Sequence, residues 1–504
     1  MKRFRWTTLL LSMSLLLPSA PEIAQADANL HIYRNESGQI HTITGYLGRF
    51  QGDSESARAL HALQLVQDTY RFTDPNRQFS YENSHLDEYG LRHQRLHQRL
   101  NNIPIFGRDV LLHEMDDALV GVSGFCEPLT PNSDMPTVKA EEAIDAAQEA
   151  VQNPTPSEDL SADLVYYPTG DQANLAYLVR VNWLGDEPGR WTVLVDALDG
   201  SILAKINNIE TSDKSVQTTM RSGIYYLIDE SRPMFEQFGS SIRTYTFQIG
   251  TQSQAQLTDL DNIWDSPEQS AAVDAHLHAG RIYDYYLQHF KRNSFDGLGS
   301  PMRSAVQFGH NYANAFWDGA QVIYGDGDDQ IPTPLSAALD ICAHEWTHAV
   351  IDTSAGLLYT GQSGALAESF ADALASVIEG RDWTLGEDLF PVGSKQTALR
   401  SLAEPAAYGQ PEHMRDYRTV EEDNGGVHLN AGIPNRAFYN FATRIHSREQ
   451  AGQVWYLALR DYLTPDADFS AARAATEQAC AVLYGPNSQI AHDLATAWLS
   501  VGVE

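Results

Sequence analysis

The sequence predicts an α+β protein of several domains, with an α+β N-terminal half followed by a β-rich lobe and a mainly helical lobe. Residues 30–113 and 163–206 alternate short strands with polar turns, and 138–151 is rich in alanine and glutamate at helical spacing. Residues 218–331 read mainly as β, with one clear helix over 272–290. Helical patterns then cover 336–353, 364–380, 431–446 and 469–483. With 504 residues, 43% of them hydrophobic, the chain can form more than one core.

The N-terminus reads as a secretory signal peptide over 1–26. Basic residues at positions 2, 3 and 5 precede an apolar run over 9–17, and Ala24-Gln25-Ala26 offers a small-residue cleavage site. The apolar run is too short to span a bilayer, and no later stretch approaches about 20 uninterrupted apolar residues. We therefore expect a mature protein that is exported, soluble and extracellular.

Charge and cysteine content narrow the class of protein. A formal charge of −32 argues against a nucleic-acid partner, which would need a basic face. The charge fits solubility outside the cell, and it also fits carboxylates that hold calcium. Three cysteines are few for a secreted chain, so disulfides are not its main support. A bridge between Cys342 and Cys480 and two separate buried thiols both remain open.

The N-terminal half is best interpreted as a folding helper or inhibitor. A proline-rich linker over 128–136 divides it, and no part of it shows a metal-ligand cluster or a nucleophile constellation. Around 210–215 the chain becomes polar and turn-rich, which is typical of a processing junction.

The stretch AHEWTHA over 343–349 predicts a metal site. His344 and His348 lie four apart in a predicted helix, so both imidazoles project from one face and can bind one ion. Glu345 projects beside them. The alternative is a helix that has two histidines by chance.

A second predicted helix supplies the missing ligand. Glu368 and Asp372 share one face, so two imidazoles and the Glu368 carboxylate would make a three-ligand zinc site with an open fourth position. Asp372 is placed to accept a hydrogen bond from a ligand histidine. Glu345 can take a proton from an activated water and pass it to a leaving amine. The alternative is a solvated acidic face, but apolar neighbours indicate a packed helix: Leu366, Phe370, Leu374 and Ile378.

These motifs closely resemble the thermolysin family of secreted zinc endopeptidases, in its pseudolysin- and vibriolysin-like form. Four further stretches match it in order: YANAFW at 312–317, YGDGD at 324–328, GLLY at 356–359 and DNGGVH at 423–428. The likeness runs from about 215 to 503. Upstream, 101–113 resembles the fungalysin/thermolysin-type propeptide, and 138–206 resembles the inhibitory module before such catalytic domains.

The resemblance implies a division of the chain and a two-lobed catalytic unit. We expect a signal peptide, an N-terminal propeptide module, an inhibitory propeptide module, a β-rich lobe and an α-helical lobe. Their ranges are 1–26, 27–127, 128–209, 210–335 and 336–504.

The resemblance also implies roles for further residues. Tyr359 and His428 would donate hydrogen bonds to the oxyanion, with Asp423 orienting His428. Asn314 and the backbone of Ala315 would bind the substrate chain. Arg400 would grip the carbonyl beyond the scissile bond. Taken singly, each has an ordinary structural alternative, such as a core tyrosine, a turn or a surface ion pair.

Substrate preference and calcium follow from the same comparison. An apolar pocket predicts a bulky hydrophobic residue on the amine side of the cut; its lining would be Leu335, Ile341, Leu385 and Leu399. Pro332 stands where the family often has an aromatic residue. One structural calcium ion is expected on a carboxylate set, for which the alternative is surface acids near a loop: Asp340, Glu379, Asp382 and Glu387.

The sequence therefore predicts a secreted zymogen of a zinc metalloendopeptidase with one zinc and one calcium ion. Its partners would be protein and peptide substrates and its own propeptide, and it would bind no nucleic acid. We expect a monomer without a membrane span. Two rival hypotheses are a non-catalytic binding protein that keeps the fold and a zinc aminopeptidase. The second would need an acidic anchor for a free amine.

Overall fold

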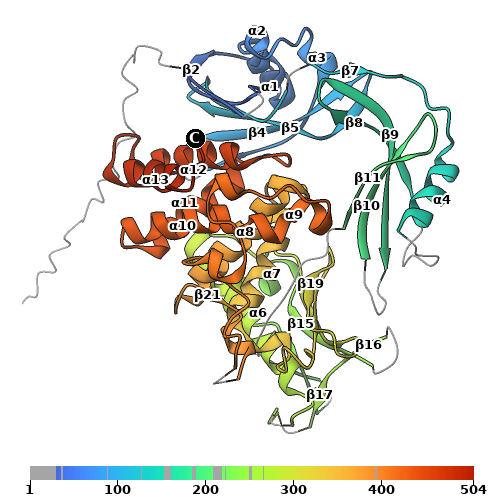
Figure 1. Cartoon of the computed structure of the whole chain (residues 1–504), viewed down its shortest axis with the longest axis vertical. Helices are drawn as coiled ribbons and strands as arrows, with labels where there is room; N and C mark the ends of the chain where they lie inside the picture. The colour runs from blue at the N-terminus through green and yellow to red at the C-terminus, as the bar shows by residue number, and fades with distance from the viewer. Residues whose placement is uncertain are drawn as a thin grey trace, which may run out of the picture.

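The computed structural model describes residues 30–35, 38–87, 89–126, 128–151, 160–183, 189–207, 218–221, 223–248, 253–260, 262–264, 266–391 and 394–504. The predicted signal peptide and the processing junction at 210–215 lie outside the described residues. Figure 1 shows the arrangement of the parts, with the N-terminal strands above the C-terminal helices and the β-rich lobe at the opposite end. The α+β class with a β-rich lobe followed by a helical lobe is confirmed.

The N-terminal module is a curved antiparallel sheet with a helix against it. Strand order is β1-β2-β6-β5, continued through β4 to β3. The helix α1 is a correction, because 30–113 reads as strands and turns. Ser54 caps it by accepting a hydrogen bond from Ala57 N at 3.1 Å, and it buries Ala59, Ala62 and Leu63. The elements are β1 His31–Arg34, β2 Ile40–Arg49, α1 Glu55–Gln64, α2 Gln67–Tyr70, α3 Pro75–Gln78, β3 Phe79–Leu86, β4 Arg92–Leu100, β5 Ile103–Met115 and β6 Ala118–Ser123.

The second module forms the predicted strands and helix. Antiparallel β8-β9-β10-β11 continues the first sheet through one parallel pairing of Ile105 with Tyr166. The predicted helix over 138–151 is α4, which packs Ala143 and Ala147 against the sheet. The elements are β7 Thr130–Pro131, α4 Ala140–Ala150, β8 Ala162–Thr169, β9 Gln172–Trp183, β10 Gly189–Asp196 and β11 Ile202–Asn207.

The β-rich lobe consists of a small sheet, a larger mixed sheet and the predicted long helix α6. The larger sheet has the order β14-β15-β18-β20-β19, so β19 forms an edge. One buried face of α6 packs on this sheet and on the helical lobe. The elements are β12 Thr219–Arg221, β13 Ile224–Tyr226, β14 Ile228–Asp229, α5 Pro233–Phe238, β15 Ile242–Phe247, β16 Gln254–Gln256, β17 Thr258–Asp259, α6 Ser270–Phe290, β18 Met302–Phe308, β19 Ala315–Trp317 and β20 Val322–Gly325.

The helical lobe packs around α7 and α8, which are buried over most of their lengths. Cys342 and Cys480 are two separate buried thiols in this core. The elements are η1 Leu335–Ala337, α7 Leu339–Asp352, α8 Gly361–Glu379, β21 Thr384–Leu385, η2 Glu387–Leu389, β22 Arg400–Ser401, η3 Pro405–Tyr408, η4 Met414–Asp416, α9 Glu422–Asn430, α10 Gly432–Arg444, α11 Arg448–Asp461, α12 Phe469–Tyr484 and α13 Gln489–Ser500.

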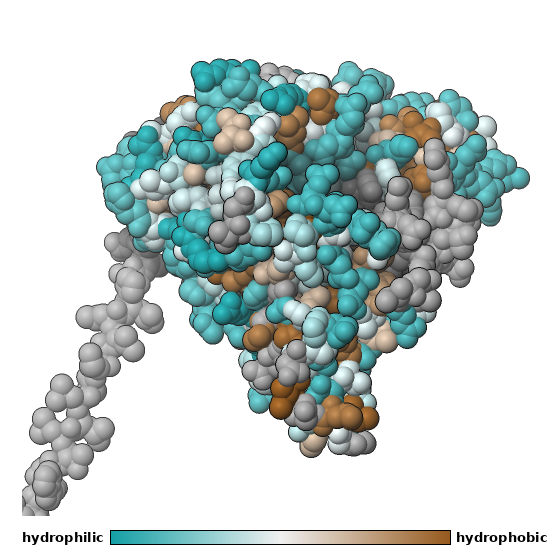
Figure 2. All heavy atoms as spheres, turned by 60° about the horizontal axis from the view of Figure 1, so that its bottom comes forward, coloured by the Kyte–Doolittle hydropathy of each residue, from teal (hydrophilic) through white to brown (hydrophobic). Residues whose placement is uncertain are grey.

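The N-terminal half adjoins the rest of the chain. β1 and β2 lie against α12, and Arg108 pairs with Asp466 at 3.5 Å. Phe106 packs against the large core of the C-terminal lobes. The face shown in Figure 2 is mostly hydrophilic, in keeping with the high net charge. Among the described residues, we find no helix that is both long and apolar enough to cross a membrane.

Candidate metal centre and active site

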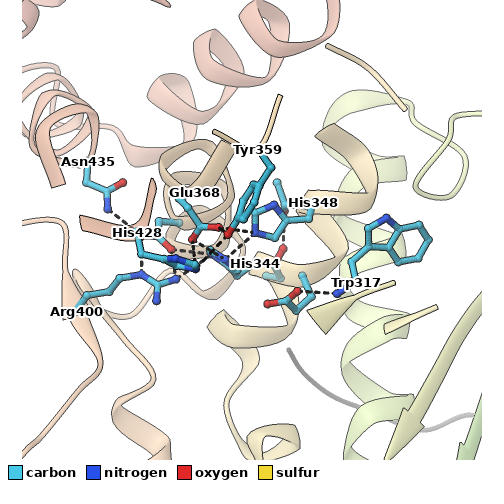
Figure 3. A network of polar contacts seen from close by, with 12 residues as sticks. Trp317, His344, His348, Tyr359, Glu368, Arg400, His428 and Asn435 are labelled. Atoms are coloured by element: carbon cyan, nitrogen blue, oxygen red, sulfur yellow. Dashed lines mark hydrogen bonds and ion pairs between the residues drawn. The ribbon is translucent and has the colours of Figure 1, made fainter. Parts of the chain in front are cut away.

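Helices α7 and α8 bring the predicted zinc ligands together. His344 Nε2 and His348 Nε2 lie 2.8 Å apart, and each is 3.5 Å from a carboxylate oxygen of Glu368. All three side chains are buried. Figure 3 shows them converging from neighbouring helices. Two imidazoles and a carboxylate aimed at one point are a donor set that suits zinc, so the residues present fit this ion.

Asp372 is bound by groups from three other elements. Its carboxylate lies 2.7 Å from His344 Nδ1 and accepts hydrogen bonds from Arg400 Nε at 2.7 Å and from Asn435 Nδ2 at 2.8 Å. The guanidinium of Arg400 outweighs the effect of burial and lowers the pKa of Asp372. A carboxylate kept ionised in this way orients His344 so that Nε2 faces the metal position.

Glu345 lies in the same buried region without belonging to the three-ligand group. Its Oε2 accepts a hydrogen bond from the backbone N–H of Trp317 in β19 at 3.1 Å. The indole Nε1 of Trp317 donates to Asp352 Oδ2 at 2.9 Å, and Asp352 is the last residue of α7. The side chain of Glu345 is therefore positioned by the edge strand of the larger sheet.

Tyr359 and His428 lie on the other side of the ligand cluster. The hydroxyl of Tyr359 donates to Glu368 and lies 3.1 Å from His428 Nε2. His428 Nδ1 is 2.6 Å from Asp423 Oδ1, and Asp423 also accepts the backbone N–H of His428 at 2.9 Å. Burial lowers the pKa of His428, but the Glu368 and Asp423 carboxylates outweigh it, so the pKa is raised.

A left-handed turn inside α9 places His428. Residues 423–426 all have positive φ, between 47° and 90°. Glycine adopts such angles without strain, and Asn and Asp are the residues that tolerate them next best. The DNGG sequence of these residues therefore allows the chain to bend so that Asp423 reaches back to His428.

The residues expected to bind substrate lie beside the cluster. Ala315 belongs to the edge strand β19 and is buried, whereas Asn314 just before it is exposed. The apolar set predicted to line a pocket belongs to one core region: Leu335, Ile341 and Leu385 are buried there and Leu399 packs against it. The side chains of Leu399 and Ile341 both lie so close to Gly386 that a Cβ at this position would clash with Leu399. Pro332 is exposed.

Three of the four expected calcium ligands gather in one place. Oxygens of Asp340, Glu379 and Glu387 lie within 4.8 Å of one another. Asp382 is not part of that group; its Oδ1 accepts the N–H of Thr384 at 2.7 Å. Burial and the neighbouring carboxylates raise the pKa of Asp340 and raise that of Glu387 to about 7. Such a set favours a cation, although Arg381 already contacts part of it, at 3.0 Å from Glu387.

Two contacts at the site were not expected from the sequence. Asn435 lies seven residues after the DNGGVH motif, and the sequence indicated only that it belongs to a helix. Trp317 lies in a matched motif, but it binds Glu345 through its backbone N–H rather than its side chain. A buried asparagine inside a helical pattern is the one signal that could have singled out Asn435, because such an amide needs a partner.

The fold and the cluster define a metallopeptidase-type site, with two histidines and a glutamate from adjoining helices and a further glutamate beside them. Residues 205–352 match the family described as thermolysin metallopeptidase, catalytic domain, and 355–503 match the thermolysin metallopeptidase, alpha-helical domain. Residues 78–124 match the fungalysin/thermolysin propeptide motif.

Known proteins of this family are similar over most of the chain. A thermolysin from Bacillus sp. (strain EA1) is 38% identical over 469 residues, which covers 83% of this chain and 84% of that protein. A bacillolysin from Brevibacillus brevis is 38% identical over 449 residues, with 83% of each covered. A solved structure, the precursor of protealysin from Serratia proteamaculans, is 36% identical, with a TM-score of 0.47, over 52% of this chain and 87% of that one.

This chain belongs to the thermolysin family. It is a zinc metalloendopeptidase of that family, and it includes a propeptide.

Proposed function

We propose that the protein is a secreted zymogen whose mature form cleaves internal peptide bonds on the amino side of bulky hydrophobic residues. The observation that best supports this proposal is the convergence of His344, His348 and Glu368, with Glu345 beside them and the Tyr359–His428 pair opposite. This arrangement provides separate groups for holding a metal, moving a proton and stabilising negative charge.

Each group has a distinct chemical task. Bound zinc would polarise the scissile carbonyl and make a water molecule more acidic. Glu345, held by Trp317 N–H, takes the proton of the attacking water and delivers it to the leaving amine. Tyr359 O–H and protonated His428 Nε2–H donate to the oxygen that becomes negative. The raised pKa of His428 favours the protonated form that this task needs.

The edge strand β19 provides a template for an extended substrate. An added peptide strand would use the backbone of Ala315 and the exposed side chain of Asn314. Arg400 would reach the carbonyl beyond the scissile bond in addition to binding Asp372. The apolar group around Leu335 and Leu399 supports a preference for a bulky hydrophobic side chain after the cut.

The site would work only after the propeptide is removed. We infer that the two N-terminal modules assist folding and block the cleft until the enzyme cleaves its own junction near 210. The predicted signal peptide would direct export, and the mature protein would be a monomer. One calcium ion would bind at Asp340, Glu379 and Glu387. Asp382 would reach that ion from the edge of the group.

The two rival functions are less well supported. A non-catalytic protein would be expected to have lost a ligand or the general base, and this sequence keeps all of them. An aminopeptidase needs an acidic group to bind the free amine of its substrate. The exposed residue just before β19 is Asn314, whose side chain is not acidic.

Chelator-sensitive internal cleavage tests the proposal. Mature protein is incubated with casein and with a peptide blocked at both ends, with and without a zinc chelator. We expect cleavage of both substrates, lost on chelation and restored by zinc. The Glu345→Gln variant should be inactive, while Glu422→Gln, at an exposed position, should retain activity. Absence of chelator-sensitive cleavage of the blocked peptide would defeat the endopeptidase proposal.

Self-processing has its own test. The Glu345→Gln zymogen, expressed without another protease, should accumulate as the uncut precursor. Normal, rapid maturation of that variant would show that the junction is cut by some other enzyme.

A further inference from the structure

A second group of two histidines and a carboxylate lies between the N-terminal module and the helical lobe. His85 on β3 and His93 on β4 are directly opposed across the antiparallel pair. Their rings are nearly parallel, at 18°, with centroids 5.0 Å apart. Asp461, the last residue of α11, approaches both from the catalytic side. We expected no metal-ligand cluster in the N-terminal half, and this prediction is wrong: Glu82, His97 and Asp109 gather within it, and His85 and His93 gain a third possible ligand, Asp461, from the other half.

The donor atoms of this group converge much as those of the catalytic cluster do. His85 Nε2 is 2.9 Å from Asp461 Oδ1, and His93 Nε2 is 3.8 Å from Asp461 Oδ2. All three residues offer a ligand atom within 4.8 Å of the others. The side chains of His93 and Asp461 are 1% and 0% exposed, while that of His85 is 46% exposed. His85 is thus partly exposed to solvent, whereas His93 and Asp461 are buried.

The surroundings of His93 favour a cation at this point. Its Nε2 also lies 3.2 Å from Asp87 Oδ2, so one ring nitrogen faces two buried carboxylates. Its Nδ1 is 2.9 Å from His113 Nδ1, which lets the two rings share a hydrogen bond and fixes the orientation of His93. Arg460 contacts Asp461 at 2.8 and 2.7 Å, and two further arginines, Arg95 and Arg292, line the adjoining cavity.

Carboxylates and arginines both surround the cluster. Asp87 and Asp461 face His93, Arg460 pairs with Asp461, and Arg95 in the wall of the neighbouring cavity pairs with Asp109 instead. A metal ion between His93 Nε2 and the two facing carboxylates would give these buried acids a cation at the point where they converge. Arg460 does not prevent metal binding, because each oxygen of Asp461 can accept from Arg460 and still offer a lone pair.

A cavity gives access to the cluster from outside. It has a volume of about 370 Å³, and its walls include His85, His93 and Asp461 together with the arginines Arg95, Arg292 and Arg460. The ring of Tyr462 stands edge-on to His93, at 5.5 Å between centroids, and covers another side. A small ion can enter through the cavity without opening the interface between the two halves.

We propose that His85, His93 and Asp461 bind a divalent transition-metal ion, with zinc as the best-suited ion, and that this ion clamps the propeptide onto the catalytic unit. Two imidazoles and a carboxylate are the ligand types of a zinc site. Two ligands come from the propeptide half and the third from α11, so the complete site exists only while the halves are together. This inference rests on the proposed role of the N-terminal modules as an inhibitory propeptide, but not on the catalytic mechanism.

The clamp has a measurable consequence through linkage. An ion that binds the joined halves and not the separated ones tightens their association by the factor 1 + [metal]/Kd, which is about 100-fold at 100 times Kd. The free propeptide keeps two of the three ligands, so this factor is an upper limit. Removal of the metal would then weaken inhibition by the propeptide.

Counting zinc ions tests the proposal directly. The full-length Glu345→Gln zymogen, which keeps the propeptide attached, is dialysed against zinc in excess calcium, and bound zinc is measured by elemental analysis. We compare it with the same zymogen carrying His85→Gln in addition. His85 is suitable because its side chain is exposed, so that replacing it leaves the buried contacts of His93 undisturbed. His492→Gln, at an exposed histidine of α13, is the matched control.

The proposal expects the His85→Gln protein to bind one zinc ion fewer than its parent, and the His492→Gln protein to bind the same number as the parent. Asp461→Asn should also lose one ion. His348→Gln should lose the catalytic ion and retain the one at the interface, which separates this test from the proposed function. Equal zinc content with and without His85→Gln would overturn the proposal.

Discussion

Replacing Asn435 with leucine should weaken zinc binding although Asn435 is not in the three-ligand group. The amide of Asn435 donates to Asp372 Oδ2 at 2.8 Å, and both side chains are fully buried. Asp372 in turn contacts His344 Nδ1 at 2.7 Å. Leucine has a similar volume and donates nothing, so the carboxylate would lose one of the groups that hold it in place.

The size of the effect follows from the kind of hydrogen bond that is lost. A buried hydrogen bond to a charged group contributes about 1.5–3 kcal/mol. Because about 1.4 kcal/mol corresponds to a factor of ten, a loss of that size transmitted to the ligand would raise the zinc Kd about 10- to 100-fold. Arg400 continues to bind Asp372, so the apoprotein should still fold.

The assay is competition for zinc with a chelator of known affinity, together with thermal unfolding of the apoprotein. The matched control is Thr476→Val, which removes the hydrogen bond from Trp498 Nε1 to a buried Thr476 hydroxyl at 2.9 Å. The control should lower Tm and leave the zinc Kd unchanged. If Asn435→Leu lowers Tm with no change in the zinc Kd, the reasoning that Asn435 positions Asp372 for His344 is refuted.

Three further predictions concern other parts of the molecule. Tyr359→Phe should lower kcat about 10²- to 10³-fold with little change in KM, because one donor to the oxyanion is lost; an unchanged kcat would exclude that role. Arg381→Gln should strengthen calcium binding, seen as a larger rise of Tm with calcium, because Arg381 pairs with Glu379 and Glu387 of the expected site; a smaller rise would contradict this. Burial raises the pKa of Asp466 to about 6 despite Arg108, so its charged form is disfavoured in the folded zymogen. The free energy of unfolding should therefore rise as pH falls through about 6 toward about 4, by at most about 3 kcal/mol. Asp466→Asn should stabilise the zymogen above pH 6 and have little effect near pH 4, as measured by urea unfolding at each pH; equal stabilisation at both pH values would contradict the assignment.

Local patterns were sufficient to predict most helices of the catalytic unit. The helix expected over 272–290 is α6 Ser270–Phe290, and those over 364–380 and 469–483 are α8 and α12 within a few residues. Helical periodicity is a short-range property, and these helices are long enough to show it. By contrast, α1 was missed, because its ten residues lie among strands and include few large apolar side chains.

The chemistry of the candidate site could be predicted from local sequence. Histidines four apart, and the acids Glu368 and Asp372 four apart, must share helix faces wherever those helices lie, and the ordered motifs supplied the expectation that the two helices meet. Three contacts between distant segments could not be predicted in this way: Asn435 with Asp372, the N–H of Trp317 with Glu345, and His85 and His93 with Asp461. The difference lies in how far apart along the chain the interacting residues are. Spacing along a helix is fixed by backbone geometry, whereas contacts between distant segments depend on how complete elements pack, and no short stretch of sequence encodes that packing.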